Sequence, residues 1–203
     1  MADFSPTHQY FVIYKPFGML SQFSDDNGRA TLGELFLFPK DVYPVGRLDQ
    51  DSEGLLILTN DKKLNHKLLN PVFKHKRKYW VQVDGEVTEQ AAEQLAKGVE
   101  IKVNKSVYKT LPANANVIPT PENLPGRNPP IRFRKNIPTS WLSLELTEGK
   151  NRQVRKMTAK VGFPTLRLIR AAIGKFEIGS MQPREVVEIP KRIAYQKFLP
   201  KEN

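Results

Sequence analysis

Apolar and polar positions along the chain predict a protein built mainly of short strands. Residues 79–83 and 141–146 alternate between apolar and polar side chains, as half-buried strands do, and 55–59 is the continuous apolar run of a buried strand. The predicted strands are 10–14, 55–59, 79–83, 141–146, 166–173, 176–178 and 186–189, with further short strands between 99 and 117.

Helical signals occur between these strands without a regular strand–helix rhythm. Thr31 opens a capping-box pattern, and Thr88 can cap a helix that ends before Gly98. The predicted helices are 31–38, a helix from Asn60 or Asp61 carrying Leu64, Leu68 and Leu69, 88–97, and a basic helix at 151–161. The irregular order predicts an α+β fold, with a mixed, largely antiparallel sheet flanked by a few helices.

Length and composition suit one globular unit. The 203 residues are 39% hydrophobic and 26% charged, which predicts a single domain of two lobes over 1–203. No apolar run reaches the roughly 18 residues of a membrane span, and no secretory signal precedes the first strand. The chain has no cysteine, which fits a cytoplasmic location, and its three histidines lack the spacing of a metal site.

The positive charge of the chain changes this picture most. A formal net charge of +11 favours a polyanionic partner, because each neutralised phosphate releases condensed counterions. Between 126 and 170, eleven Lys and Arg residues face only Glu145 and Glu148, and a basic run at 74–78 leads directly into Tyr79 and Trp80. Basic residues beside aromatics suit RNA, whose splayed bases need a stacking surface. Residues 118–138, rich in proline and arginine, are predicted to form a long loop.

The stretch 45–56 is the strongest candidate for chemistry. Two glycines, Gly46 and Gly54, bracket charged residues directly before an apolar strand, which places Asp49 on a tight loop fixed to a rigid element. Glycine and aspartate are also common turn formers, so Asp49 could simply bond nearby backbone amides.

Four motifs in order make the chain resemble the pseudouridine synthases of the RsuA/RluB/RluE/RluF group, and the resemblance extends from Tyr10 to the C-terminal strands. The motifs are Lys15-Pro16-x-Gly18, Gly46-Arg47-Leu48-Asp49 with Ser52-x-Gly54-Leu55-Leu56, the basic segment 148–157, and Leu168-x-Arg170-x-x-Ile173-Gly174.

This resemblance implies the pseudouridine synthase fold, with a central catalytic cleft. Only nine residues precede the first strand, so we expect no N-terminal S4 RNA-binding domain. That departure, with the segments 128–132 and 137–142, is most similar to the RluE branch, which acts on large-subunit (23S) ribosomal RNA. The implied reaction isomerises a uridine to pseudouridine, needs no cofactor, and is expected of a monomer without membrane contact.

The resemblance also assigns roles to residues. Asp49 is the catalytic carboxylate, acting either as a nucleophile at C1′ or as a base at C2′. Arg155 is the guanidinium partner that keeps this carboxylate ionised. Tyr79 stacks on the flipped base, Leu168 packs under the nucleotide, and Arg47 holds its phosphate or fills its vacated place.

The remaining basic and polar candidates are expected to bind RNA along its backbone, while Asp51 and Glu53 are interpreted as loop-shaping or solvated residues. The RNA-binding candidates are Lys76, Lys78, Arg132, Arg134, Lys150, Asn151, Arg152 and Lys156.

Two other functions compete with this interpretation. A non-catalytic rRNA-binding or ribosome-assembly protein would share the charge and the basic helix but would not need Asp49. A glycosidase would pair Asp49 with Asp51 or Glu53, but it would need a neutral sugar cleft, which the flanking arginines disfavour.

Overall fold

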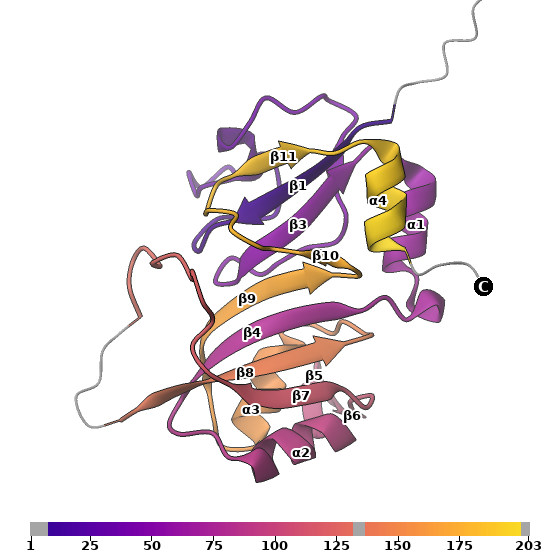
Figure 1. Cartoon of the computed structure of the whole chain (residues 1–203). Coiled ribbons are helices and arrows are strands. Elements are labelled where there is room, and N and C mark those ends of the chain that lie inside the picture. Colours follow the sequence, from indigo (N-terminus) through magenta and orange to yellow (C-terminus); the bar gives the residue numbers. More distant parts are fainter. Residues whose placement is uncertain (1–7, 132–136, 200–203) are drawn as a thin grey trace, which may run out of the picture.

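The computed structural model describes residues 8–131 and 137–199, and these form one extended sheet with helices on its faces (Figure 1). The sheet contains β1 (Tyr10–Lys15), β2 (Tyr43–Pro44), β3 (Glu53–Thr59), β4 (Arg77–Asp84), β7 (Asn114–Ile118), β8 (Thr139–Leu146), β9 (Thr165–Ile173), β10 (Phe176–Glu177) and β11 (Val186–Glu188). A separate hairpin consists of β5 (Glu100–Val103) and β6 (Ser106–Lys109). The helices are α1 (Lys62–Leu69), α2 (Glu89–Lys97), α3 (Gln153–Lys160) and α4 (Lys191–Phe198), with 3-10 turns at Leu32–Glu34 and Pro71–Phe73.

The strand order is β11-β1-β3-β9-β4-β8-β7, with β2 on β3 and β10 on β9. Every pairing of these strands is antiparallel except β3 with β9, which run parallel where the two halves of the sheet meet. The predicted α+β class with a largely antiparallel sheet is therefore confirmed.

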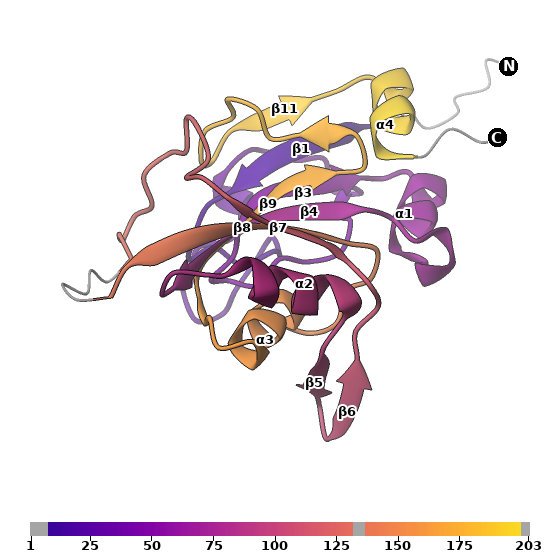
Figure 2. The same ribbon diagram turned by 60° about the horizontal axis from the view of Figure 1, so that its bottom comes forward.

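Three apolar clusters follow the alternation of side chains along the strands. On one face, Tyr10, Val12 and Tyr14 of β1 pack with residues of α1 and α4, which lie side by side in Figure 1. On the other face, Phe11 and Ile13 pack under the segment 19–42. The same face of the second half packs against α2 and α3, as Figure 2 shows. The second face is thus covered by the segment 19–42 in one half and by α2 and α3 in the other, on either side of the β3–β9 junction.

Side-chain capping explains the ends of two predicted helices. Asp61 accepts hydrogen bonds from the backbone amides of Lys63 and Leu64 at the start of α1, and its second oxygen accepts from the hydroxyls of Tyr10 and Tyr195. One carboxylate therefore ties β1, α1 and α4 together. Thr88 caps α2 in the same way.

The helix predicted at 31–38 is wrong. Its capping contact exists, since Glu34 accepts the Thr31 amide at 2.9 Å, but only a 3-10 turn forms. The Thr31 hydroxyl donates instead to the carbonyl of Phe23, and the chain then extends so that Phe36 and Phe38 pack on the ring of Phe11. Tertiary packing of aromatics overrides the local helix signal.

Other differences are smaller. The basic helix α3 begins at Gln153, after Arg152 adopts a left-handed backbone, rather than at 151. Strand β2 and helix α4 were not predicted. Helix α4 starts after Pro190 and buries Ala194 and Phe198. This apolar stripe is too short to predict a helix from the sequence, and it is buried by packing against the sheet.

A close approach of backbones fixes the junction of the two halves. Gly54 has φ +100°, and a Cβ there would lie 2.5 Å from the carbonyl oxygen of Arg170, so a side chain would force β3 and β9 apart. Beside this contact, Glu53 accepts two hydrogen bonds from the guanidinium of Arg167, at 2.8 and 2.7 Å. Both side chains of this ion pair are buried, so the interpretation of Glu53 as a loop-shaping or solvated residue is wrong.

We predict that Glu53→Ala lowers the free energy of unfolding by about 3–5 kcal/mol, because the Arg167 charge is left buried without its partner. Urea unfolding followed by tryptophan fluorescence measures the loss. The matched control is Glu93→Ala, which removes a carboxylate from an exposed pair with Lys97 on α2 and should have little effect. Equal stability of the Glu53→Ala variant and the wild type would contradict the prediction.

Candidate active site

The loop 45–52 connects β2 to β3 and carries the candidate carboxylates. Its backbone is held at both ends: the Leu48 amide donates to the hydroxyl of Ser21, and that hydroxyl donates back to the Leu48 carbonyl. The Ser52 amide closes a turn onto the Asp49 carbonyl at 3.0 Å. The loop is therefore rigid on the side that faces the core and presents Asp49 outward.

A buried ammonium group links this loop to the turn after β1. Lys15 Nζ donates to the carbonyls of Pro16 at 2.9 Å, Met19 at 2.7 Å and, more weakly, Gln50 at 3.4 Å. Burial lowers the pKa of Lys15 to about 8, against the opposing charges of Glu53, Asp51 and Asp49. The Lys-Pro motif thus holds the backbone between the two aspartates.

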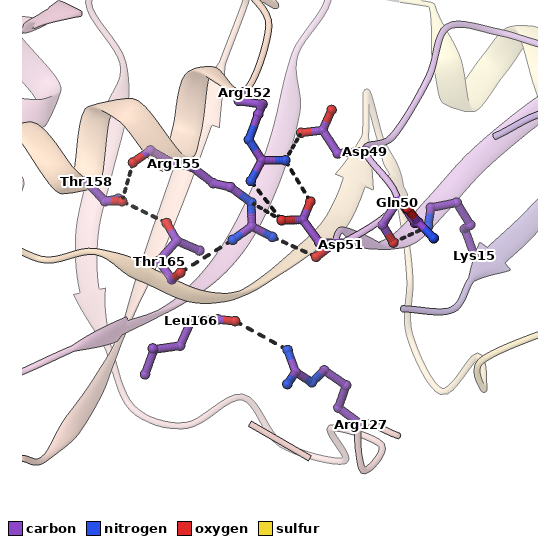
Figure 3. Close-up of polar contacts among 10 residues, drawn as sticks. All are labelled: Lys15, Asp49, Gln50, Asp51, Arg127, Arg152, Arg155, Thr158, Thr165 and Leu166. Carbon is purple, nitrogen blue, oxygen red and sulfur yellow. Dashed lines mark hydrogen bonds and ion pairs between the residues drawn. The ribbon is translucent and has the colours of Figure 1, made fainter. Parts of the chain in front are cut away.

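Asp49 has a guanidinium neighbour, but it is Arg152. Arg152 Nη1 lies 3.6 Å from Asp49 Oδ2, and the same guanidinium makes two hydrogen bonds to the carboxylate of Asp51, at 3.0 and 2.8 Å (Figure 3). The Asp49 side chain is 35% exposed, so it lies at the surface of the site.

Arg155, the residue assigned to Asp49 by resemblance, is directed to Asp51. Its Nη2 donates to the Asp51 carbonyl at 2.6 Å, its Nε lies 3.4 Å from the Asp51 carboxylate, and its Nη1 donates to the carbonyl of Thr165. Arg155 therefore joins α3, the start of β9 and the loop 45–52. Burial lowers the pKa of Arg155, partly offset by the charges of Asp51 and Asp49.

Asp51 is the centre of this group. Burial alone would raise the pKa of its carboxyl, but the hydrogen bonds from Arg152 and the charges of Arg155 and Arg152 lower it below its ordinary value. The sequence interpretation of Asp51 as loop-shaping is consistent with these contacts, yet it missed that two arginines about 100 residues away converge there.

The segment before α3 aims Arg152 at the loop. Arg152 has φ +52°, a left-handed conformation uncommon for arginine. The preceding residues are held by Glu148, which accepts from the Gln153 side chain and the Tyr108 hydroxyl, while the Lys150 ammonium lies 4.8 Å from the centre of the Tyr108 ring. The β5–β6 hairpin thus supports the basic segment through Tyr108, which contacts both Glu148 and Lys150.

The other residues implied by resemblance lie on the face under α3. Leu168 on β9 is buried, and half-buried Tyr79 on β4 packs against the same apolar cluster, which includes Val154 of α3. Arg47 is exposed, two positions before Asp49 in the loop. These placements are compatible with the proposed roles.

The RNA-binding candidates fall into two groups in the structure. Lys150 and Asn151 are exposed at the start of α3, and Lys156 is half-buried on that helix. Lys76 is exposed and pairs with Glu145 at 2.9 Å, and Lys78 follows it in β4. Arg132 and Arg134 lie outside the described residues.

Arg127 was not singled out from the sequence, although it belongs to the basic run. Its guanidinium stacks 4.3 Å from the centre of the Phe17 ring and donates to the carbonyls of Pro129 and Leu166. Burial lowers the pKa of Arg127. Arg127, Phe17 and Glu53 line a cavity of about 240 Å³ beside the Lys-Pro turn, so the root of the proline-rich segment packs against the site.

Within residues 8–131 and 137–199, no helix has the length and apolar character that a bilayer crossing requires. The same residues contain no group of three or more His, Asp or Glu side chains arranged to hold a metal ion.

Comparison with known proteins identifies relatives over most of the chain. The family described as RNA pseudouridylate synthase matches residues 9–160. Ribosomal large subunit pseudouridine synthase E of Vibrio parahaemolyticus is 52% identical over 178 residues, covering 88% of this chain and 72% of that protein. Its namesake from Xanthomonas campestris is 47% identical over 174 residues, covering 85% and 90%.

More distant matches agree. Ribosomal large subunit pseudouridine synthase B of Bacillus subtilis is 34% identical over 162 residues, covering 79% of this chain and 59% of that protein. Among solved structures, a crystal structure of a pseudouridylate synthase superposes with a TM-score of 0.76 at 24% identity, covering 95% of this chain and 74% of that one. This last likeness supports the fold alone.

The low pKa of Lys15 predicts a specific pH dependence of stability. The folded pKa of about 8 lies below the ordinary value of 10.5, so between these values the unfolded chain binds more protons than the folded chain. Stability contributed by Lys15 should therefore rise with pH through this window, by up to about 1.4 kcal/mol per pH unit.

Urea unfolding of the wild type and of Lys15→Met at about pH 7.5, 8.5 and 9.5 measures this. The variant is less stable throughout, because it loses three hydrogen bonds, but the gap should widen as pH rises. Lys97→Met, at an exposed position of α2, is the control and should follow the wild type. A constant gap between wild type and Lys15→Met would disprove the assignment.

Proposed function

The chain belongs to the RNA pseudouridylate synthase family and is an isomerase, and from this premise we propose that it converts one uridine of large-subunit (23S) ribosomal RNA to pseudouridine with Asp49 as the essential carboxylate. The observation that carries the proposal is the Asp49 carboxylate on a rigid loop, exposed to substrate and within 3.6 Å of a guanidinium. The substrate class is supported by the names of relatives about 50% identical over most of the chain.

The reaction rearranges bonds without adding or removing atoms. The C1′–N1 bond of the uridine breaks, the uracil turns, and a C1′–C5 bond forms, while the proton on C5 is lost and N1 gains one. The base must leave its stack before any side chain can reach C1′. What the enzyme must supply is a group that acts on the ribose, a place for the turning base and a hold on the RNA backbone.

Asp49 can act on the ribose in two ways. As a nucleophile its carboxylate would attack C1′ and form a temporary ester, and as a base it would remove the C2′ proton to form a glycal. Both routes require the ionised carboxylate, with an oxygen free to reach the sugar. The Arg152 guanidinium lies 3.6 Å away and does not cover the side chain, which is 35% exposed.

Leu168 and Tyr79 offer a floor and a stacking surface for the base. Both belong to the apolar cluster under α3, next to the β3–β9 junction from which the catalytic loop emerges. In our proposal Tyr79 stacks on the flipped uracil and Leu168 packs beneath it. Exposed Arg47 holds the phosphate of the flipped nucleotide or fills its place in the RNA, and Arg155 keeps the loop and α3 together.

The RNA backbone would cross the basic rim of the site. A net charge of +11 favours this polyanion, and phosphate contacts position a protein on its nucleic acid. We place the enzyme in the cytoplasm as a monomer acting without a cofactor. The proposed backbone contacts are Lys76, Lys78, Arg132, Arg134, Lys150, Asn151, Arg152 and Lys156.

The decisive experiment maps pseudouridines in 23S rRNA from cells that lack the gene. Wild-type protein should restore one missing pseudouridine, whereas Asp49→Asn should restore none and lose at least about 10³-fold in turnover on rRNA in vitro. The amide keeps the shape of the side chain but cannot serve as nucleophile or base, so RNA binding by filter retention should stay within a few-fold of the wild type. The control Asp41→Asn, on an exposed turn before β2, should be fully active. Turnover by Asp49→Asn would sink the proposed chemistry.

Binding to rRNA should depend steeply on salt. If about 6–10 phosphates are contacted, the affinity falls about 10³–10⁵-fold between roughly 50 and 200 mM salt. Lys150→Ala should weaken binding and reduce the slope of log K against log salt by about one, because a single phosphate contact is lost. A flat salt response would contradict an electrostatic footprint on the RNA backbone.

A further inference from the structure

Asp49 and Asp51 share the guanidinium of Arg152, and we propose that Asp51 is a positioning residue that keeps Arg152 from closing onto Asp49. The inference rests on the proposed role of Asp49. In the proposed arrangement, Asp51 touches neither the substrate nor the reacting atoms and acts only through Arg152.

The distances show a competition between two carboxylates for one guanidinium. Arg152 makes a two-point contact with Asp51, with nitrogen–oxygen distances of 3.0 and 2.8 Å, and only a longer approach of 3.6 Å to Asp49. Paired parallel hydrogen bonds between guanidinium and carboxylate are stronger and more directional than a single long contact. Asp51 therefore determines where the Arg152 guanidinium sits.

Without the charge of Asp51, the nearest carboxylate for Arg152 is Asp49. The left-handed backbone of Arg152 and the anchoring of Gln153 by Glu148 hold the start of this side chain beside the loop, where Asp49 is within its reach. A two-point contact with Asp49 would occupy both carboxylate oxygens. That would block attack at C1′ and proton removal at C2′ alike, so the consequence does not depend on which route is used.

Arg155 allows the effect of Arg152 to be isolated. Its shortest contact with Asp51 is to the backbone carbonyl, at 2.6 Å, and it also reaches the Thr165 carbonyl. Both acceptors survive any change of the Asp51 side chain. Replacing Asp51 by asparagine should therefore leave α3 and β9 joined to the loop while releasing Arg152.

The negative charge of Asp51 also repels the phosphates of RNA. The proposal therefore predicts different effects of an Asp51 substitution on turnover and on RNA affinity. The Asp51 carboxylate is 36% exposed beside the proposed phosphate path, and Arg152 is 43% exposed. Removing a negative charge from an RNA-binding rim should leave affinity unchanged or improve it. A positioning role then predicts slower turnover without weaker binding, whereas general damage to the site would impair both.

The test compares Asp51→Asn, Arg152→Gln and the double variant on rRNA under single-turnover and steady-state conditions. We expect Asp51→Asn to lower kcat about 10- to 100-fold, with KM equal to or below the wild-type value. Arg152→Gln should mainly raise KM, because a phosphate contact is lost. The double variant should regain a kcat within about threefold of Arg152→Gln, since the guanidinium that captures Asp49 is gone. Asp41→Asn controls for the same substitution at a distance.

Two results would overturn the proposal: a kcat of Asp51→Asn within about twofold of wild type, or a double variant as slow as Asp51→Asn. Circular dichroism and urea unfolding establish that each variant is folded before the comparison is made. Failure of the broader function is distinguishable, because wild-type protein would then form no pseudouridine at all.

Discussion

The site exists because two parallel strands meet in an otherwise antiparallel sheet. Parallel neighbours begin at the same edge, so the segment that precedes β3 and the segment that precedes β9 arrive together. The first segment carries Asp49 and Asp51, and the second is helix α3 with its arginines. Gly54 permits this pairing, since a side chain there would collide with the backbone of Arg170. The geometry of the candidate site therefore depends on a close contact between two backbones.

The charged groups near this junction differ in how deeply they are buried and in what they contact. The pair of Glu53 and Arg167 is buried and serves the fold, because its guanidinium also binds the Pro125 carbonyl at the root of the proline-rich segment. Lys15 is buried, and its ammonium donates to the carbonyl oxygens of Pro16 and Met19, so it holds the backbone of the neighbouring turn. Asp51 and Arg152 are partly exposed, at 36% and 43%. Breaking the buried pair should therefore cost more stability than breaking the exposed pair.

Much of the fold could be predicted from local signals. Strands such as β3 and β8 follow from apolar runs and alternation, α1 and α2 from their caps at Asp61 and Thr88, and the candidate Asp49 from the glycine-bracketed loop. The failures share a physical cause. The segment 31–38 has helical signals but is extended by aromatic packing, and the link from Asp51 to Arg152 spans 101 positions that no local pattern connects. Resemblance supplied residue types for the site but not their pairing, since Arg152 lies beside both aspartates and Arg155 is directed to Asp51.

Helix α3 illustrates a compromise between stability and activity. It begins without a side-chain cap and with no acidic residue in its first turn, while Lys150, Arg152, Arg155 and Lys156 gather around the positive end of its dipole. An engineer seeking a more heat-resistant enzyme would first place aspartate or glutamate there. That improvement would neutralise the region that we propose binds RNA, so thermal robustness has to be sought elsewhere, for instance in the apolar contacts of Val154 and Met157 on the buried side of the same helix.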